Sequence, residues 1–188
     1  MDRILREIKE HFGELINEDA AITLAEYRLG KRGIRRVQGY FAYSDGETTV
    51  VVRDSPEVYK GFVSAKCGQL VELFIQNDLI IDYVPKNEFR DVFTPLCDLI
   101  VNRYHCVRGF VSGIGGIKVV KNGRKIALLR ITDKMSFATV VLWDDKVDYY
   151  KKVDIGDEIR LYNVFANEFN GEINLHVGRR SFVELRNS

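Results

Sequence analysis

Two aromatic residues in the last third of the chain lie at positions where the sequence does not predict a hydrophobic core. Trp143, the only tryptophan, ends an apolar run and is followed directly by two aspartates. Phe169 precedes Asn170 and Gly171, in what the pattern predicts to be a turn between two strands. Rings displayed beside basic residues are typical of platforms on which unpaired bases stack. Each ring has a simpler interpretation as a core residue, because large aromatics are usually well buried.

Basic residues surround these two rings in the sequence. Residues 121–124 contain an Asn-Gly pair and predict a hairpin turn with basic flanks. Such charges could contact phosphates, or they could form an ordinary solvated face. Phe137 and Phe165 lie within expected strands and could face either the core or a groove. Arg179 and Arg180 are adjacent, so at most one of them would face a groove if they lie in a strand. The candidate nucleic-acid-binding residues are Trp143, Phe169, Lys118, Lys121, Arg124, Lys125, Arg130, Phe137 and Arg179.

Charge is distributed unevenly along the 188 residues, although the net charge is only +1. Residues 1–100 carry 13 Lys/Arg and 17 Asp/Glu, a net charge of −4. Residues 101–188 carry 15 Lys/Arg and 10 Asp/Glu, a net charge of +5. The basic half is the half with the two displayed rings, and this asymmetry favours a module that binds a polyanion.

Other kinds of function find little support in the sequence. It contains no phosphate-binding P-loop, no H-E-x-x-H and no G-x-S-x-G, so we expect no enzymatic activity. Cys67, Cys97 and Cys106 lack the close spacing of zinc ligands, and we expect reduced, partly buried thiols with no metal or other cofactor. No apolar run reaches the roughly 18 residues that cross a bilayer, and the first residues do not resemble a secretory signal. We therefore expect a cytoplasmic, nucleoid-associated protein with no membrane partner.

The first half of the chain predicts helices followed by strands. Residues 2–11 and 17–29 read as helices, with Asn17 as an N-cap and Gly30 as a terminating residue. Strands are expected at 37–43 and 48–52 around a turn, and at 69–75 and 79–84, with a helical turn starting at Ser55-Pro56. These elements fit a small α+β region or a divergent OB-like barrel. Residues 85–95 contain two prolines and are the expected linker.

The second half predicts a regular, mainly β pattern. Strands are expected at 104–112, 117–120, 126–131, 137–143, 158–164 and 172–177, with 181–185 at an edge and a short helix at 145–151. Residues 104–112 and 117–120 together count as the first strand, which leaves five strands with a short helix between the third and the fourth. This is the order of an OB-fold, a small barrel that binds oligonucleotides. The predicted domains are a helical segment (1–33), the α+β or OB-like region (34–95) and the C-terminal OB-fold barrel (98–188).

Residues 98–185 resemble a DNA-binding OB domain of the archaeal replication protein A family. The matching pieces are Asp98-Leu99, Val107-Arg108-Gly109-Phe110-Val111, Val140-Val141-Leu142-Trp143-Asp144-Asp145, Ile155-Gly156-Asp157, Asn163 and residues 169–179. Residues 13–30 are also similar to a helical segment that precedes OB domains in archaeal members. The zinc-binding element of some family members is absent, and residues 35–95 match no family pattern.

The resemblance implies that Trp143 and Phe169 stack on bases of single-stranded DNA, while basic residues of the first hairpin contact phosphates. It implies a single-stranded DNA-binding protein that protects DNA in replication, repair or recombination. Other replication protein A subunits, or replication and repair proteins, are possible partners. Two alternatives stay open: an OB-fold assembly subunit that holds other proteins, and an RNA- or tRNA-binding OB module. In the assembly alternative both rings would be buried.

Overall fold

The computed structural model describes residues 2–12, 16–28, 33–120 and 123–186, and this part of the chain is mainly β. Contacts divide the chain into two compact units. One comprises residues 1–53 and 59–91, and the other comprises residues 54–58 and 92–188. The limits of the three expected domains stay a prediction.

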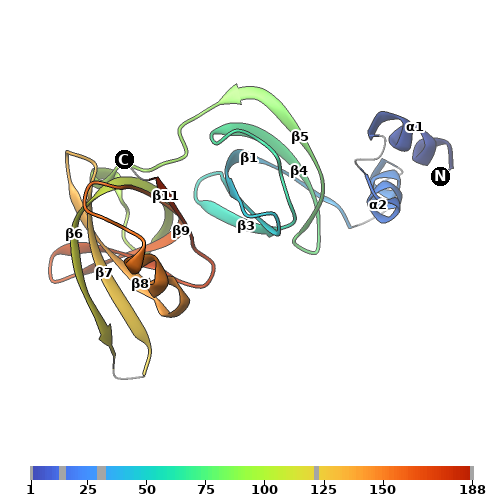
Figure 1. Cartoon of the computed structure of the whole chain (residues 1–188). Helices are drawn as coiled ribbons and strands as arrows, with labels where there is room; N and C mark the ends of the chain where they lie inside the picture. The colour runs from blue at the N-terminus through green and yellow to red at the C-terminus, as the bar shows by residue number, and fades with distance from the viewer. Residues whose placement is uncertain (1, 13–15, 29–32, 121–122, 187–188) are drawn as a thin grey trace. The chain divides into compact units, whose positions relative to one another are not determined.

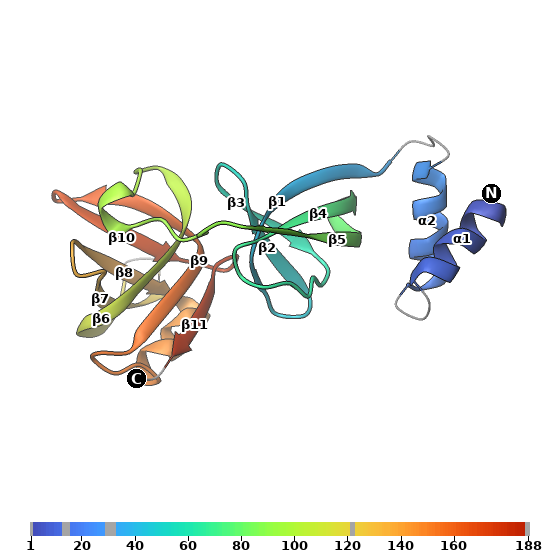
Figure 2. The ribbon, with the colours of Figure 1, turned by 90° about the horizontal axis from the view of Figure 1, so that it is seen from above.

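The two N-terminal helices pack against each other as a hairpin (Figure 2). They are α1 (Asp2–Phe12) and α2 (Glu18–Arg28). Their contact buries Ile8 of α1 and Ala21, Leu24 and Ala25 of α2. Asn17 is the N-cap of α2 as predicted, because its Oδ1 accepts a hydrogen bond from the backbone N–H of Ala20 at 2.8 Å. The expected end of this helix at Gly30 lies outside the described residues.

Residues 35–89 form a closed barrel of five strands (Figure 1). The strands are β1 (Arg35–Ser44), β2 (Thr48–Val52), β3 (Pro56–Lys60), β4 (Gln69–Gln76) and β5 (Leu79–Phe89). They close in the order β1-β2-β3-β5-β4, with β3 and β5 parallel. This is the strand order of an OB-type barrel, so the OB-like alternative for this region describes it better than an α+β region.

Two expectations for this region were wrong. Pro56 begins strand β3, where the sequence predicted a helical turn. Residues 85–89 continue strand β5, where the sequence predicted a linker. Pro85 is tolerated because it pairs with Val71 beside an irregularity in the β4–β5 register, where the regular ladder of N–H bonds is already interrupted.

The second unit contains a barrel of the same strand order (Figure 1). Its strands are β6 (Arg103–Val119), β7 (Lys125–Thr132), β8 (Phe137–Trp143), β9 (Glu158–Phe169), β10 (Glu172–Val177) and β11 (Phe182–Arg186). The sheet order is β10-β8-β7-β6-β9-β11, and an additional β10–β9 pairing closes the ring. Strands β8 and β10 are parallel, and β11 pairs with the first half of β9. The expected order of the C-terminal strands is thus observed.

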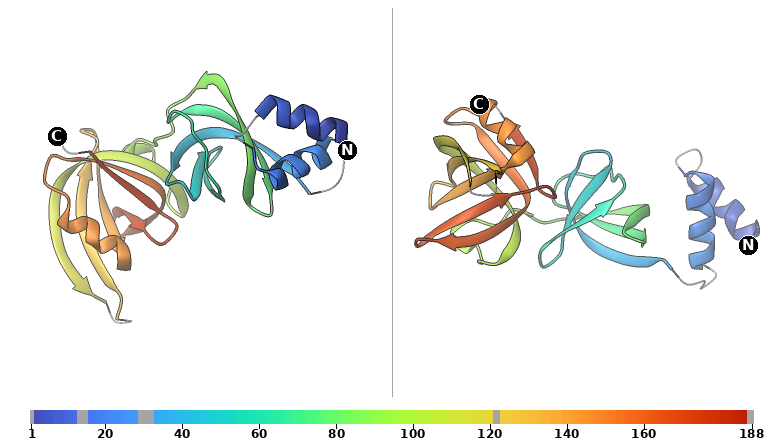
Figure 3. Two further views of the ribbon diagram at one scale, coloured as in Figure 1. Left: turned by 45° about the vertical axis from the view of Figure 1, so that its right-hand side comes forward. Right: turned by 90° about the horizontal axis from the view of Figure 1, so that it is seen from below.

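The first strand of this barrel is longer than the sequence predicted, and two 3-10 helices contribute to its core. Strand β6 is continuous, with register irregularities near Val111 and Ile114, where the sequence predicted two shorter strands. The short helix after β8 is the 3-10 helix η3 (Asp144–Lys151), drawn in orange in Figure 3. Its Val147 belongs to the barrel core. A second 3-10 turn, η2 (Leu96–Asp98), places Leu96 in the same core. Alternate residues of β7 and β8 fill the core: Ala127, Leu129, Ile131, Ala138, Val140 and Leu142.

Candidate nucleic-acid interface

The strand registers assemble one outer face on the second barrel, across β7, β8, β10 and β9. Because side chains alternate along a strand, the neighbours of the core residues point away from the core. One row of paired residues runs Leu128–Val141–His176–Phe165–Tyr104. The next runs Arg130–Thr139–Asn174–Asn167. Beyond it, Phe137 pairs with Thr132, and Phe169 pairs with Glu172. We call these positions, with Trp143 at the end of β8, the outer face.

Trp143 is half-buried and held at its edge by a histidine. Its indole Nε1–H donates to Nδ1 of His176 at 2.9 Å. The planes of the two rings are nearly parallel, at 26°, and their centroids are 5.9 Å apart. His176 Nε2 lies 3.0 Å from Oδ1 of Asn167. Since Nδ1 accepts from Trp143, Nε2 carries the proton and donates to Asn167, and the imidazole is neutral in this arrangement.

Arg124 covers the Trp143 ring with its guanidinium, whose central carbon lies 4.4 Å from the ring centroid. The same guanidinium donates to Oδ2 of Asp144 from Nε at 2.9 Å and from Nη2 at 2.7 Å. Asp144 directly follows Trp143 in the chain, so the carboxylate holds the cation over its neighbour. A guanidinium placed this way can stack with a base and pair with a phosphate.

A hollow of about 380 Å³ opens beside the indole ring; we call it the tryptophan hollow. Tyr104 and Phe165 add two more rings, with centroids 5.3 Å apart. Arg179 and Arg180 lie in a turn rather than a strand, so both line the hollow. The lining residues are Tyr104, Arg124, Trp143, Phe165, His176, Gly178, Arg179, Arg180 and Ser181.

Buried polar side chains hold this arginine turn in place. Asn163 Nδ2 donates to the backbone oxygen of Arg180 at 2.9 Å. Ser181 Oγ donates to the backbone oxygen of Asn163 at 2.8 Å and accepts from the N–H of Gly178 at 3.1 Å. The arginine pair is therefore presented by a fixed backbone.

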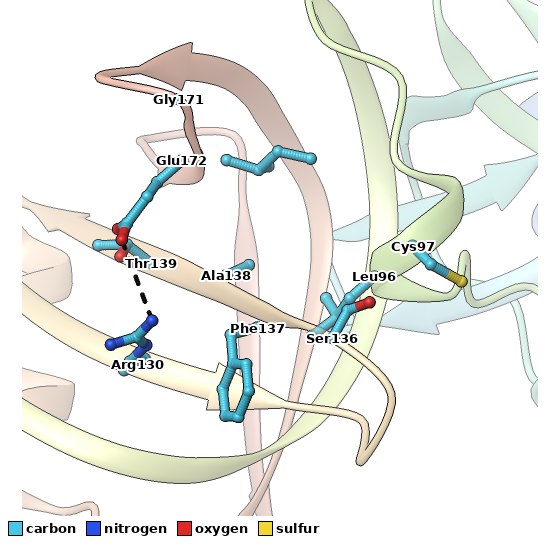
Figure 4. Close-up of a pocket in the computed structure, with 10 residues that line it drawn as sticks. Leu96, Cys97, Arg130, Ser136, Phe137, Ala138, Thr139, Gly171 and Glu172 are labelled. Carbon is cyan, nitrogen blue, oxygen red and sulfur yellow. Dashed lines mark ion pairs between the residues drawn. The ribbon is translucent and has the colours of Figure 1, made fainter.

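A second hollow, of about 370 Å³, lies at the opposite end of β8; we call it the Phe137 hollow (Figure 4). Phe137 is 58% exposed, and the guanidinium carbon of Arg130 lies 5.2 Å from its ring centroid. Arg130 also approaches Glu172 of β10, with Nη2 4.0 Å from Oε1, as the dashed line in Figure 4 marks. This hollow thus repeats the pairing of an arginine with an aromatic ring.

Phe169 is 66% exposed and is the last residue of β9, rather than part of the turn as predicted. Asn170 and Gly171 form the turn, with φ of 54° and 79°, the left-handed values of a two-residue hairpin. Phe169 lines neither hollow, although Gly171 and Glu172 beside it line the Phe137 hollow.

The structure therefore places five of the predicted residues in two hollows. Trp143, Arg124 and Arg179 share the tryptophan hollow, while Arg130 and Phe137 share the other. Lys118 and Lys125 are exposed on the arms of the β6–β7 hairpin and line neither hollow. Lys121 lies outside the described residues. Which of these residues bind nucleic acid stays a prediction.

Sequence reasoning missed Tyr104, did not count His176 or Arg180 among the candidate residues, and left Phe165 undecided between core and groove. The alternation within residues 172–177 does place His176 on the face opposite the core residue Leu175. No local signal places Tyr104 beside Phe165, because their pairing joins strands about 60 residues apart in sequence. Burial lowers the pKa of His176 from its ordinary value of 6.5, which favours the neutral ring.

Within the described residues, no group of three or more His, Cys, Asp or Glu is placed to hold a metal ion. Cys67 and Cys97 are exposed thiols, and Cys106 is buried. No helix in the described part of the chain is long and apolar enough to cross a membrane.

No family model and no curated protein matches this chain. Among solved structures, it is similar to a replication factor A related protein from Methanobacterium thermoautotrophicum, at 25% identity over 50% of this chain and 90% of that chain, with a TM-score of 0.45. It is also similar to a domain of replication protein A from Methanococcus maripaludis, at 15% identity over 49% of this chain and 92% of that chain, with a TM-score of 0.42.

A third similarity spans more of the chain. The p204 HINb domain is 10% identical over 82% of this chain and 98% of that domain, with a TM-score of 0.52. The matched 82% of this chain is longer than either barrel alone, so the similarity in fold includes residues of both barrels.

Proposed function

We propose that this protein binds single-stranded DNA through the outer face of the second barrel, in the manner of replication protein A. The observation that supports this most strongly is the tryptophan hollow, where Trp143 lies beneath the guanidinium of Arg124 and beside Arg179 and Arg180. Unpaired bases offer flat apolar faces for the ring, and their phosphates offer charges for the arginines.

The other exposed rings extend this interaction along the face. Phe137 and Phe169 are more than half exposed, whereas an assembly subunit that used this face only as barrel structure would bury them. Stacking tolerates any base, so we expect weak sequence preference. The protein would protect single strands during replication, repair or recombination, without chemistry of its own and alongside partner subunits.

Fluorescence anisotropy with labelled oligomers of about 25 units tests this proposal, since that length exceeds the roughly 4–16 nucleotides that one such barrel covers. The probes are oligo-dT, oligo-rU and a DNA duplex of the same length. Tightest binding to oligo-dT is expected. A duplex that binds as tightly as oligo-dT would exclude base stacking as the mechanism, and this outcome matters because a murine DNA-binding protein of similar fold (TM-score 0.51) is bound to double-stranded DNA. Preference for oligo-rU would instead support the RNA-binding alternative.

A further inference from the structure

Trp143 stands at the end of its strand, is only half-buried and is not part of the buried core cluster, so the barrel core alone does not fix the ring's plane. Its Nε1–H is a donor without accepting capacity and needs one well-placed acceptor. Nδ1 of His176 is that acceptor, at 2.9 Å. The histidine ring also lies nearly parallel to the indole, at 26°.

His176 is itself oriented from the next strand. Its Nε2–H donates to Oδ1 of Asn167 at 3.0 Å, so one hydrogen-bonded chain runs from β8 through β10 to β9. The Asn167 bond selects the tautomer that leaves Nδ1 free to accept. Arg124, Arg179 and Arg180 line the same hollow. Burial lowers the pKa of His176, which disfavours a second proton on the imidazole.

We infer that His176 is a positioning residue, which with Asn167 fixes the plane of the Trp143 ring for base stacking. A ring held in its binding orientation loses less conformational freedom when a base stacks on it, so affinity rises without any contact between the histidine and DNA. This inference rests on the proposed function for its effect on binding. The restraint on the ring is a property of the free protein.

Two substitutions distinguish the role of His176 as a hydrogen-bond acceptor from its role as a ring that fills space. His176→Asn keeps an oxygen near the position of Nδ1 and removes the imidazole. His176→Phe keeps a ring of similar size and removes the acceptor. If the hydrogen bond positions Trp143, His176→Asn should behave like the native protein and His176→Phe should not. If the histidine only fills space, the order should reverse.

The first readout is the fluorescence anisotropy and acrylamide quenching of the single tryptophan in the free protein. Trp143 should be more mobile and more accessible in His176→Phe than in the native protein or in His176→Asn. The second readout is the ratio of affinities for oligo-dT and for an abasic oligomer of equal length, which isolates stacking from phosphate contacts. This ratio should fall about fivefold in His176→Phe, the effect of losing one hydrogen bond.

Asn167→Ala provides an independent test if a His176 variant does not fold. It removes the partner of Nε2 without touching Trp143, and it should raise tryptophan mobility in the same direction. Unchanged mobility in both His176→Phe and Asn167→Ala would overturn the inference. A native protein with equal affinity for oligo-dT and the abasic oligomer would instead reject the stacking function, while the mobility readout would still decide the role of His176.

Discussion

At the scale of residues, the candidate site consists of aromatic rings that have polar partners. Trp143 has Arg124 over its face and His176 at its edge, and Phe137 has Arg130 over its face. In the free protein the guanidinium and the aromatic ring interact with each other, and the same guanidinium can pair with a phosphate when a base binds to the ring.

Trp143→Ala should weaken oligo-dT binding by roughly 5- to 150-fold, because stacking contributes about 1–3 kcal/mol per base. Trp143→Phe keeps a smaller ring, and its affinity for oligo-dT should lie between that of the native protein and that of the alanine variant. Anisotropy titration measures both, and circular dichroism checks the fold. A Trp143→Ala protein that melts far below the native one would show that the ring is a core residue.

Phe137→Ala and Phe169→Ala should each weaken oligo-dT binding while changing the free energy of unfolding by less than about 0.5 kcal/mol, as is usual for exposed positions. The matched control is Phe62→Ala, because Phe62 is 55% exposed and belongs to the first barrel. Equal losses of affinity in all three variants would mean that the outer face has no special role.

The lowered pKa of His176 predicts a pH effect on stability. The unfolded chain protonates this ring near pH 6.5, whereas the folded protein does so only at lower pH. The neutral His176 ring therefore contributes fully to the free energy of unfolding above about pH 6.5. This contribution is lost as the pH falls through the pKa of His176 in the folded protein. Urea unfolding, followed by Trp143 fluorescence, should show a steeper loss of stability below about pH 6.5 in the native protein than in His176→Asn. Parallel pH curves for the two proteins would contradict this.

At the scale of elements, the sequence predicted most strands and missed the features that depend on pairing. Strand β8 and strand β10 match their predicted limits, because a short apolar run marks β8 and alternating apolar residues mark β10, each bounded by a turn. Pro56 was misread as a helix start, since a proline tolerated at the first position of a strand carries the same local signal. Phe169 was misplaced because only its pairing with Glu172 extends β9 that far.

The residues of the candidate site also fall into those that the sequence could predict and those that depend on strand pairing. Trp143, Arg124 and Arg179 could be predicted because they stand beside recognisable strands and turns. Tyr104 could not, since it joins the hollow only through the closure of β6, β9, β10 and β8 into a ring. For His176 the alternation of β10 indicates the outward face, but not that Trp143 is its neighbour. Residue type alone does not reveal which strands become neighbours in a barrel.

The β6–β7 hairpin carries a prediction of its own. Lys118→Ala and Lys125→Ala should each reduce the slope of log affinity against log salt by about one, if each lysine contacts a phosphate. Lys151→Ala on helix η3 is the matched control, because Lys151 is also exposed on the same barrel. Slopes are measured with oligo-dT between about 50 and 200 mM salt. Unchanged slopes would limit phosphate contacts to the arginines of the hollows.

At the scale of the whole molecule, the chain contains two barrels of one topology with different surfaces. The half that holds the second barrel has a net charge of +5, and the half before it has −4. A barrel that binds a polyanion and a barrel that does not would show this difference. One barrel covers only about 4–16 nucleotides, so strong binding to long strands would need several copies or partner subunits.

The most direct measurement is a titration of native Trp143 fluorescence with oligo-dT of about 25 nucleotides, longer than one barrel covers, at about 50 and 200 mM salt. Because Trp143 is the only tryptophan, the signal reports the tryptophan hollow alone. Quenching that saturates at a defined stoichiometry and weakens with salt is the expected result. An unchanged Trp143 signal, at oligomer concentrations where anisotropy shows the DNA to be bound, would contradict the stacking of bases on this ring.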